Sequence, residues 1–190
     1  FMPCSFLSRY ADMAHHPQYF DEAAKQITLF AGHALDPAKH LVYHAYDDAK
    51  TQKWADPKTG LSSFFWSRAN GWYAMAILES LDYIPQSHPQ RPALLQILQT
   101  LAQGIREAQD ADSGCWRQLL RQPALIAGQS NYLEASGSCM FCYTLAHGSR
   151  MGYLDKASLR AAKIAYAGIL KTFIHIDAAP KPVGAYPHAQ

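Results

Sequence analysis

Apolar residues recur every three or four positions along most of this sequence, which is the spacing of one face of an α-helix. Pro17 and the Asp36-Pro37 pair interrupt the pattern and are expected to end the first two helices. Helices are predicted over Pro3–Ala14, Gln18–Ala34, Arg68–Leu81, Ala93–Ala108 and Glu134–Met151, with a last one capped by Asp155. The pattern therefore predicts an all-α protein.

The predicted helices differ in how far their apolar residues extend around them. Arg68–Leu81 and Glu134–Met151 are apolar on nearly every side, which indicates burial on most sides. Ala93–Ala108 instead has one apolar stripe, formed by Leu94, Ile97, Leu98, Leu101 and Ile105, against a polar face. Single stripes are also predicted for the first helix (Phe6, Tyr10, Met13), the second (Tyr19, Ala23, Ile27, Phe30, Ala34) and the last (Leu159, Ala162, Tyr166, Ile169, Phe173).

The chain also repeats an arrangement of segments. Ala69-Asn70-Gly71 aligns with Ala135-Ser136-Gly137, 66 positions later, which sets Arg68 against Glu134. Each unit has a short extended segment, a small-residue break, a buried inner helix and an amphipathic outer helix. The extended segments are 41–46 (LVYHAY) and 115–120 (CWRQLL). Repeated hairpins of this kind indicate a toroid of two concentric helix layers, of which three hairpins are predicted here.

Composition agrees with one globular domain, which we assign to residues 1–176, followed by an irregular tail over 177–190. The chain has 190 residues, 49% of them apolar and 17% charged. Its net charge of +2 comes from scattered residues, which argues against a nucleic-acid partner. No apolar run reaches the roughly 18 residues of a spanning helix, so no membrane partner is predicted.

Four cysteines are present, at positions 4, 115, 139 and 142. Cys139 and Cys142 form a CxxC, but they lie in a helix-like apolar run and lack a second pair of ligands. Small buried helix residues are therefore favoured over a zinc or redox site. This usage of cysteine fits a reducing compartment.

The candidate chemistry centres on Arg68 and Trp72. These residues stand four apart and share one face if the helix has begun by Arg68. A guanidinium can form a fork of hydrogen bonds to a carboxylate, and an indole can stack on the flat face of a sugar or a base. The pair therefore suits an anionic, ring-shaped ligand. The alternative is a helix-start arginine paired with a surface acid, beside a tryptophan of the core.

Other candidates lie in the loops. His44, in the extended segment 41–46, is expected near the helix mouths, and its alternative is a purely structural group. Asp47 and Asp48 follow it and resemble a turn, which favours solvated turn acids over a role in the site. No nucleotide-binding, zinc-protease or esterase motif is present, which removes the commonest readings of those classes.

Three segments resemble glycoside hydrolase family 105, the unsaturated rhamnogalacturonyl hydrolases, and more distantly family 88. They are YHAYDD with WADPKTG, FFWSRANGWYAMAILESLDYIP, and NYLEASGSCMFCYTLAHGSRMGYL. The resemblance spans Phe1 to Ile176 and implies an (α/α) barrel of six hairpins without a metal or organic cofactor. It implies that the sugar site is lined by His44, Arg68, Trp72 and Met2, with Trp66 and Trp54 in support.

The chain departs from this family in three respects. The catalytic aspartate of the family falls just upstream of Phe1, and three further hairpins with a second aspartate have no counterpart. The tail from Ala178 also differs. We therefore expect the C-terminal half of such an enzyme, without its general acid/base, and with open barrel edges that favour self-association.

The resemblance implies hydration of the C4=C5 double bond in a small acidic unsaturated disaccharide, in the cytoplasm. One carboxylic acid can serve as both acid and base in this reaction. An inactive remnant that acts as an interaction or carbohydrate-binding module is the alternative. Another toroid enzyme, such as an isoprenoid cyclase, would need acidic metal-binding clusters on its helices, and the sequence has none that is recognisable.

Overall fold

Six helices make up most of the structure, a computed structural model that describes residues 2–176, with the backbone alone for Met2. They are α1 (Met2–Met13), α2 (Gln18–Ala34), α3 (Ser67–Tyr83), α4 (Arg91–Glu107), α5 (Ala135–Arg150) and α6 (Lys156–Phe173). The predicted all-α class is confirmed, and the predicted helix ends are shifted by at most two residues. The predicted irregular tail over 177–190 and the side chain of Met2 lie outside the described residues.

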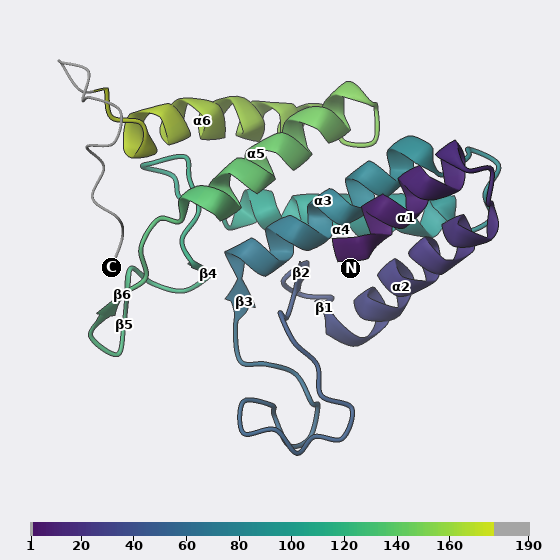
Figure 1. The fold of residues 1–190 in the computed structure, drawn as a ribbon. Coiled ribbons are helices and arrows are strands. Elements are labelled where there is room, and N and C mark those ends of the chain that lie inside the picture. Colours follow the sequence, from purple (N-terminus) through teal and green to yellow (C-terminus); the bar gives the residue numbers. More distant parts are fainter. Residues whose placement is uncertain (1, 177–190) are drawn as a thin grey trace, which may run out of the picture.

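The helices form three hairpins in two layers (Figure 1). α1, α3 and α5 pack side by side, and α2, α4 and α6 each pack on the inner helix that precedes them. This is the arrangement of neighbouring hairpins in an (α/α) barrel, which confirms the architecture predicted from the repeat.

The strands are short and join the loops at one end of the helices. They are β1 (Leu35–Asp36), β2 (Leu41–Val42), β3 (Phe65–Trp66), β4 (Leu119–Leu120), β5 (Leu125–Ile126) and β6 (Gln129–Ser130), paired antiparallel as β1–β2, β3–β4 and β5–β6. The extended segment predicted over 41–46 is a strand only at its first two residues, and Tyr46 then forms an isolated bridge to Leu61. The β3–β4 pair ties the start of α3 to the loop that follows α4, with Trp66 opposite Leu119.

The two helices that were predicted to be buried on most sides, α3 and α5, differ in how far they are buried. In α3, Tyr73, Ile77 and Leu78 have no exposed surface, as expected of a helix with neighbours on several sides. In α5 the prediction holds for one side only, because Tyr143 is 39% exposed. α5 is the last inner helix, packed against α3 and α6, and the described chain has no further inner helix to cover its other flank. The prediction of a buried Cys139 is wrong for the same reason, since this thiol is exposed.

The buried face of α6 differs from the predicted stripe. Small residues form the buried face, which consists of Ser158, Ala161, Ala162, Ala165 and Gly168. Tyr166, which the pattern placed inside, is 62% exposed, and Leu159 is also exposed. Small side chains let α6 lie close to α5, and a large ring on that face would hold the two helices apart. The spacing of large apolar residues therefore predicted the helix but not its rotation.

Candidate functional site

The candidate site lies where α3 and α5 begin. Trp66 is extended, and α3 starts at Ser67, so Arg68 and Trp72 share a face one turn apart. Trp72 is 37% exposed, which rules out the alternative of a core tryptophan. Arg68 does pair with an acid, but with the buried Glu134 rather than with a surface one. The site therefore combines features of both interpretations.

Two groups hold the Arg68 guanidinium. Its Nε lies 3.5 Å from Glu134 Oε1, an ion pair without hydrogen-bond geometry. Its Cζ lies 4.6 Å from the ring centroid of Trp66, a cation–π contact. The Arg68 side chain is 41% exposed, and its two terminal nitrogens form no hydrogen bond within the described residues. They are the part of this cation that can bind a ligand.

Glu134, which sequence reasoning did not select as a site residue, lies at the centre of the polar contacts. Its side chain caps α5, since Oε2 accepts from the amide of Gly137 at 2.9 Å and also from the hydroxyl of Ser67 at 2.8 Å. Ser136 donates its hydroxyl to Oε1. With 5% of its surface exposed, Glu134 is a buried carboxylate whose charge Arg68 balances. The repeat that aligned Arg68 with Glu134 was the signal that could have identified it.

Two glycines allow the starts of α3 and α5 to approach so closely. A Cβ on Gly71 would lie 2.7 Å from Met140 Sδ, and a Cβ on Gly137 would lie 2.7 Å from Ser67 Oγ. Both distances are shorter than any ordinary contact, so a larger residue would push the helices apart. These glycines occupy equivalent positions of the repeat, and their packing brings Glu134 within reach of Arg68.

His44 joins this group from the loop after β2. Its Nδ1 lies 3.1 Å from the hydroxyl of Ser62, and its ring meets the Trp66 ring edge-on, with centroids 6.1 Å apart. The Trp66 Nε1 atom is buried without a hydrogen-bond partner among the described residues. His44 is itself exposed, so one ring nitrogen is fixed by Ser62 while the imidazole still reaches the surface.

The two aspartates that follow His44 serve the loop. Asp47 accepts hydrogen bonds from the amides of Thr51 and Gln52 at 2.7 and 2.9 Å. Hydrogen bonds from the backbone of Gln52 and then Thr51 hold the pKa of Asp47 below its ordinary value, against the opposing effect of desolvation. Asp48 accepts from the Tyr46 hydroxyl. Trp54 belongs to the same loop and is exposed, and no recorded contact of the described residues joins it to Arg68.

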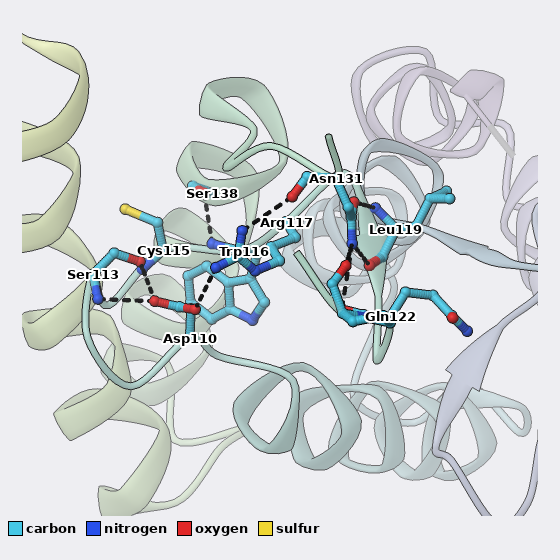
Figure 2. Close-up of polar contacts among 10 residues, drawn as sticks. Asp110, Ser113, Cys115, Trp116, Arg117, Leu119, Gln122, Asn131 and Ser138 are labelled. Atoms are coloured by element: carbon cyan, nitrogen blue, oxygen red, sulfur yellow. Dashed lines mark hydrogen bonds and ion pairs between the residues drawn. The ribbon is translucent and has the colours of Figure 1, made fainter. Parts of the chain in front are cut away.

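A polar frame holds the loop that leads from α4 to Glu134 (Figure 2). Arg117 donates to Asp110 at 3.2 Å and to the backbone carbonyl of Asn131 at 3.1 Å. The buried Asn131 side chain in turn bonds the backbone around β4. The amide of Glu134 donates to the carbonyl of Trp116 at 2.8 Å, so the frame fixes the residue that begins α5.

The described residues offer neither a metal site nor a membrane-spanning helix. Within residues 2–176, no three His, Cys, Asp or Glu side chains are placed so that they could hold a metal ion. Cys142 of the CxxC donates its thiol to the Ala162 carbonyl of α6 at 3.5 Å. None of the helices in the described part of the chain is long and apolar enough to cross a membrane.

Comparisons with known sequences identify relatives. Residues 1–185 match the model of glycosyl hydrolase family 88. Protein Atu3128 of Agrobacterium fabrum is 34% identical over 180 residues, which are 93% of this chain and 75% of that protein. The unsaturated rhamnogalacturonyl hydrolase YesR of Bacillus subtilis is 32% identical over 136 residues, 70% of this chain and 35% of that protein.

Solved structures agree with the sequence relatives. A glycoside hydrolase of family 105 from Clostridium acetobutylicum (C. acetobutylicum ATCC 824) has a TM-score of 0.86 and 36% identity, over 92% of this chain and 48% of its own. A possible family 105 member from Klebsiella pneumoniae has a TM-score of 0.73 and 28% identity, over 87% of this chain and 40% of its own. The chain thus spans about half the length of the first of these structures.

Proposed function

This chain belongs to the glycoside hydrolases of families 88 and 105, and we propose that its site at the start of α3 and α5 binds the unsaturated uronic acid of a short sugar chain. The reaction proposed for the whole enzyme is hydration of the C4=C5 double bond in unsaturated galacturonyl-rhamnose, a product of pectin breakdown. The name of the relative YesR, an unsaturated rhamnogalacturonyl hydrolase, supports this substrate class. We propose a cytoplasmic location.

The single observation behind this proposal is the pairing of Arg68 with Trp72 on one exposed face. The terminal nitrogens of Arg68 can donate two parallel hydrogen bonds to the substrate carboxylate. Trp72, one turn further along α3, can stack on the apolar face of the same sugar ring. His44 is suited to bind a hydroxyl group or the attacking water with the ring nitrogen that Ser62 leaves available. Trp66 supports Arg68 from below, and Met2 and Trp54 remain candidates for the pocket lining.

The proposed hydration needs one acid and one water molecule. A carboxylic acid donates a proton to C4, positive charge develops at C5 and the ring oxygen, and the water oxygen bonds to C5. One proton of that water returns to the carboxylate, and the other stays in the new hydroxyl group at C5. The resulting hemiketal opens to a ketone at C5, and the hemiacetal at C1 then releases the neighbouring sugar as its alcohol. A single carboxyl group therefore completes the proton cycle.

We propose that residues 1–190 contain the substrate-binding side of this site without its acid. Asp47, the carboxylate closest in sequence to His44, accepts hydrogen bonds from the loop amides of Thr51 and Gln52, which lower its pKa and disfavour a role as proton donor. Glu134 is buried and pairs with Arg68. Purified residues 1–190 should therefore bind the unsaturated disaccharide without hydrating it.

The test has two measurements on the purified chain. Calorimetry should detect binding of unsaturated galacturonyl-rhamnose and weaker binding of its methyl ester, which lacks the negative charge. The ultraviolet absorbance of the double bond should stay constant in the same samples. No preference for the acid over the ester would contradict the binding role, and steady loss of absorbance would place an acid within these residues, with Asp47 as the first to substitute.

The second candidate is an interaction module, and one observation favours it. On α1, Phe6 and Met13 are 67% and 69% exposed, and with Tyr10 they line an apolar hollow of about 470 Å3. A surface of this kind tends to be covered by protein. We propose that two copies associate through their open barrel edges, and Phe6→Ser with Met13→Ser should then lower the mass seen by light scattering. A wild-type chain that is monomeric at all concentrations would exclude this role.

A further inference from the structure

We propose that Glu134 is a positioning residue that holds the Arg68 guanidinium in the one orientation that suits an incoming carboxylate. The inference rests on the proposed function of this site and adds a residue from the neighbouring hairpin to it. Glu134 acts through Arg68, and it caps α5 rather than the helix that presents the ligand-binding face.

The carboxylate of Glu134 is itself rigidly placed. Three donors hold it, namely the hydroxyls of Ser67 and Ser136 and the amide of Gly137. They belong to α3 and α5, and the group is almost fully buried. A buried carboxylate with this many donors cannot turn without leaving one of them unsatisfied, so it provides a fixed point for its ion-pair partner.

The position of the Glu134 carboxylate decides how Arg68 can bind the carboxylate of a ligand. A guanidinium can hold a carboxylate either at its end, with both terminal nitrogens, or at its side, with Nε and one terminal nitrogen. Arg68 Nε is buried, with Glu134 Oε1 3.5 Å away and no hydrogen bond between them, and the Trp66 ring covers one face of the guanidinium. The side-on mode is therefore closed to a ligand, because Nε is buried beside Glu134. Only the end-on fork remains, and its two nitrogens have no partner within the described residues.

If only charge mattered, Glu134 would weaken the binding of an anionic ligand to Arg68. A buried negative charge next to the cation weakens the attraction of Arg68 for an anion. If charge were the whole effect, the neutral Glu134→Gln variant should bind the uronic acid more tightly. If Glu134 positions Arg68, the same variant should bind it more weakly. The two explanations thus predict changes of opposite sign in the affinity of Glu134→Gln for the uronic acid.

The experiment uses residues 1–190 with three substitutions. Glu134→Gln removes the charge, and Glu134→Asp keeps the charge and the helix cap but withdraws the carboxylate by one methylene. Asp155→Asn is the matched control, because Asp155 also caps a helix and pairs with an arginine, Arg106, in another part of the fold. Calorimetry gives the affinities for the unsaturated disaccharide and its methyl ester. Nitrogen-edited NMR gives the solvent exchange rate of the Arg68 Nε proton, assigned by its loss in Arg68→Lys.

Both Glu134 variants should bind the acid about tenfold more weakly, which is the lower end of the loss known for residues that orient a metal ligand, with little change for the ester. Exchange of the buried Arg68 Nε proton should become faster in both, and Asp155→Asn should change neither quantity. Tighter binding of the acid by Glu134→Gln, or an equal loss for acid and ester, would overturn the proposal. If the wild-type chain binds neither sugar, the proposed function fails, and the exchange rate still decides whether Glu134 holds Arg68.

Discussion

Replacing Arg68 with lysine tests the anionic half of the site most directly. The charge is kept, but lysine has a single ammonium group in place of the end-on fork, and it lacks the guanidinium whose Cζ lies over the Trp66 ring. One charge-assisted hydrogen bond contributes about 1.5–3 kcal/mol. At about 1.4 kcal/mol per factor of ten, Arg68→Lys should weaken binding of the unsaturated disaccharide about 10- to 150-fold.

The assay is calorimetric titration of residues 1–190, repeated with the methyl ester of the same sugar. The ester lacks the charge that Arg68 recognises, so its affinity should change much less. Arg160→Lys, an exposed position on α6, controls for the general effect of the substitution. If Arg68→Lys binds the acid as tightly as the wild-type chain does, Arg68 has no role in carboxylate recognition and the bidentate argument fails.

Three further outcomes are expected. Trp72→Ala should lower affinity for acid and ester alike through lost stacking, with a modest change in thermal stability because the indole is partly exposed; unchanged affinity would remove Trp72 from the site. Gly71→Ala should destabilise the fold by about 1–3 kcal/mol in urea unfolding, because its methyl group meets Met140, whereas Gly32→Ala on open α2 surface should not. Asp155→Ala should lose about 0.5–2 kcal/mol of stability with the α6 cap. The Ser158 amide lowers the pKa of Asp155, so its contribution is present above the unfolded pKa of about 4 and should vanish as the pH falls through the folded pKa.

The helices could be predicted from the sequence because their signals are local. Pro17 precedes α2, Asp155 caps α6, and the apolar periodicity between such positions sets the rest. The rotation of α6 could not be predicted in this way. Its buried face is made of serine, alanine and glycine, which a search for large apolar residues overlooks. These small residues allow the close approach of α5 and, at Gly168, of the backbone of Ser113.

For the candidate site, the sequence predicts contacts only between residues of the same segment. Arg68 and Trp72 could be paired because helical geometry relates residues four apart. Loop contacts such as that of His44 with Trp66 depend on how β2 and β3 lie, and no periodicity specifies this. Asp47 could have been a catalytic or a turn acid by sequence, and only its backbone partners distinguish the two.

For Glu134, the sequence repeat gave its alignment with Arg68, and only the structure gave the contact between them. The repeat already aligned it with Arg68, yet alignment relates equivalent positions without placing them in contact. Equivalent positions at the start of neighbouring inner helices become neighbours only if those helices pack closely there, and Gly71 and Gly137 make that possible. Opposite charges at such positions are then forced to pair across the inner layer. In a toroid of hairpins, two neighbouring inner helices that carry opposite charges at aligned starting positions, with a glycine close by in each, are thus predicted to form an ion pair.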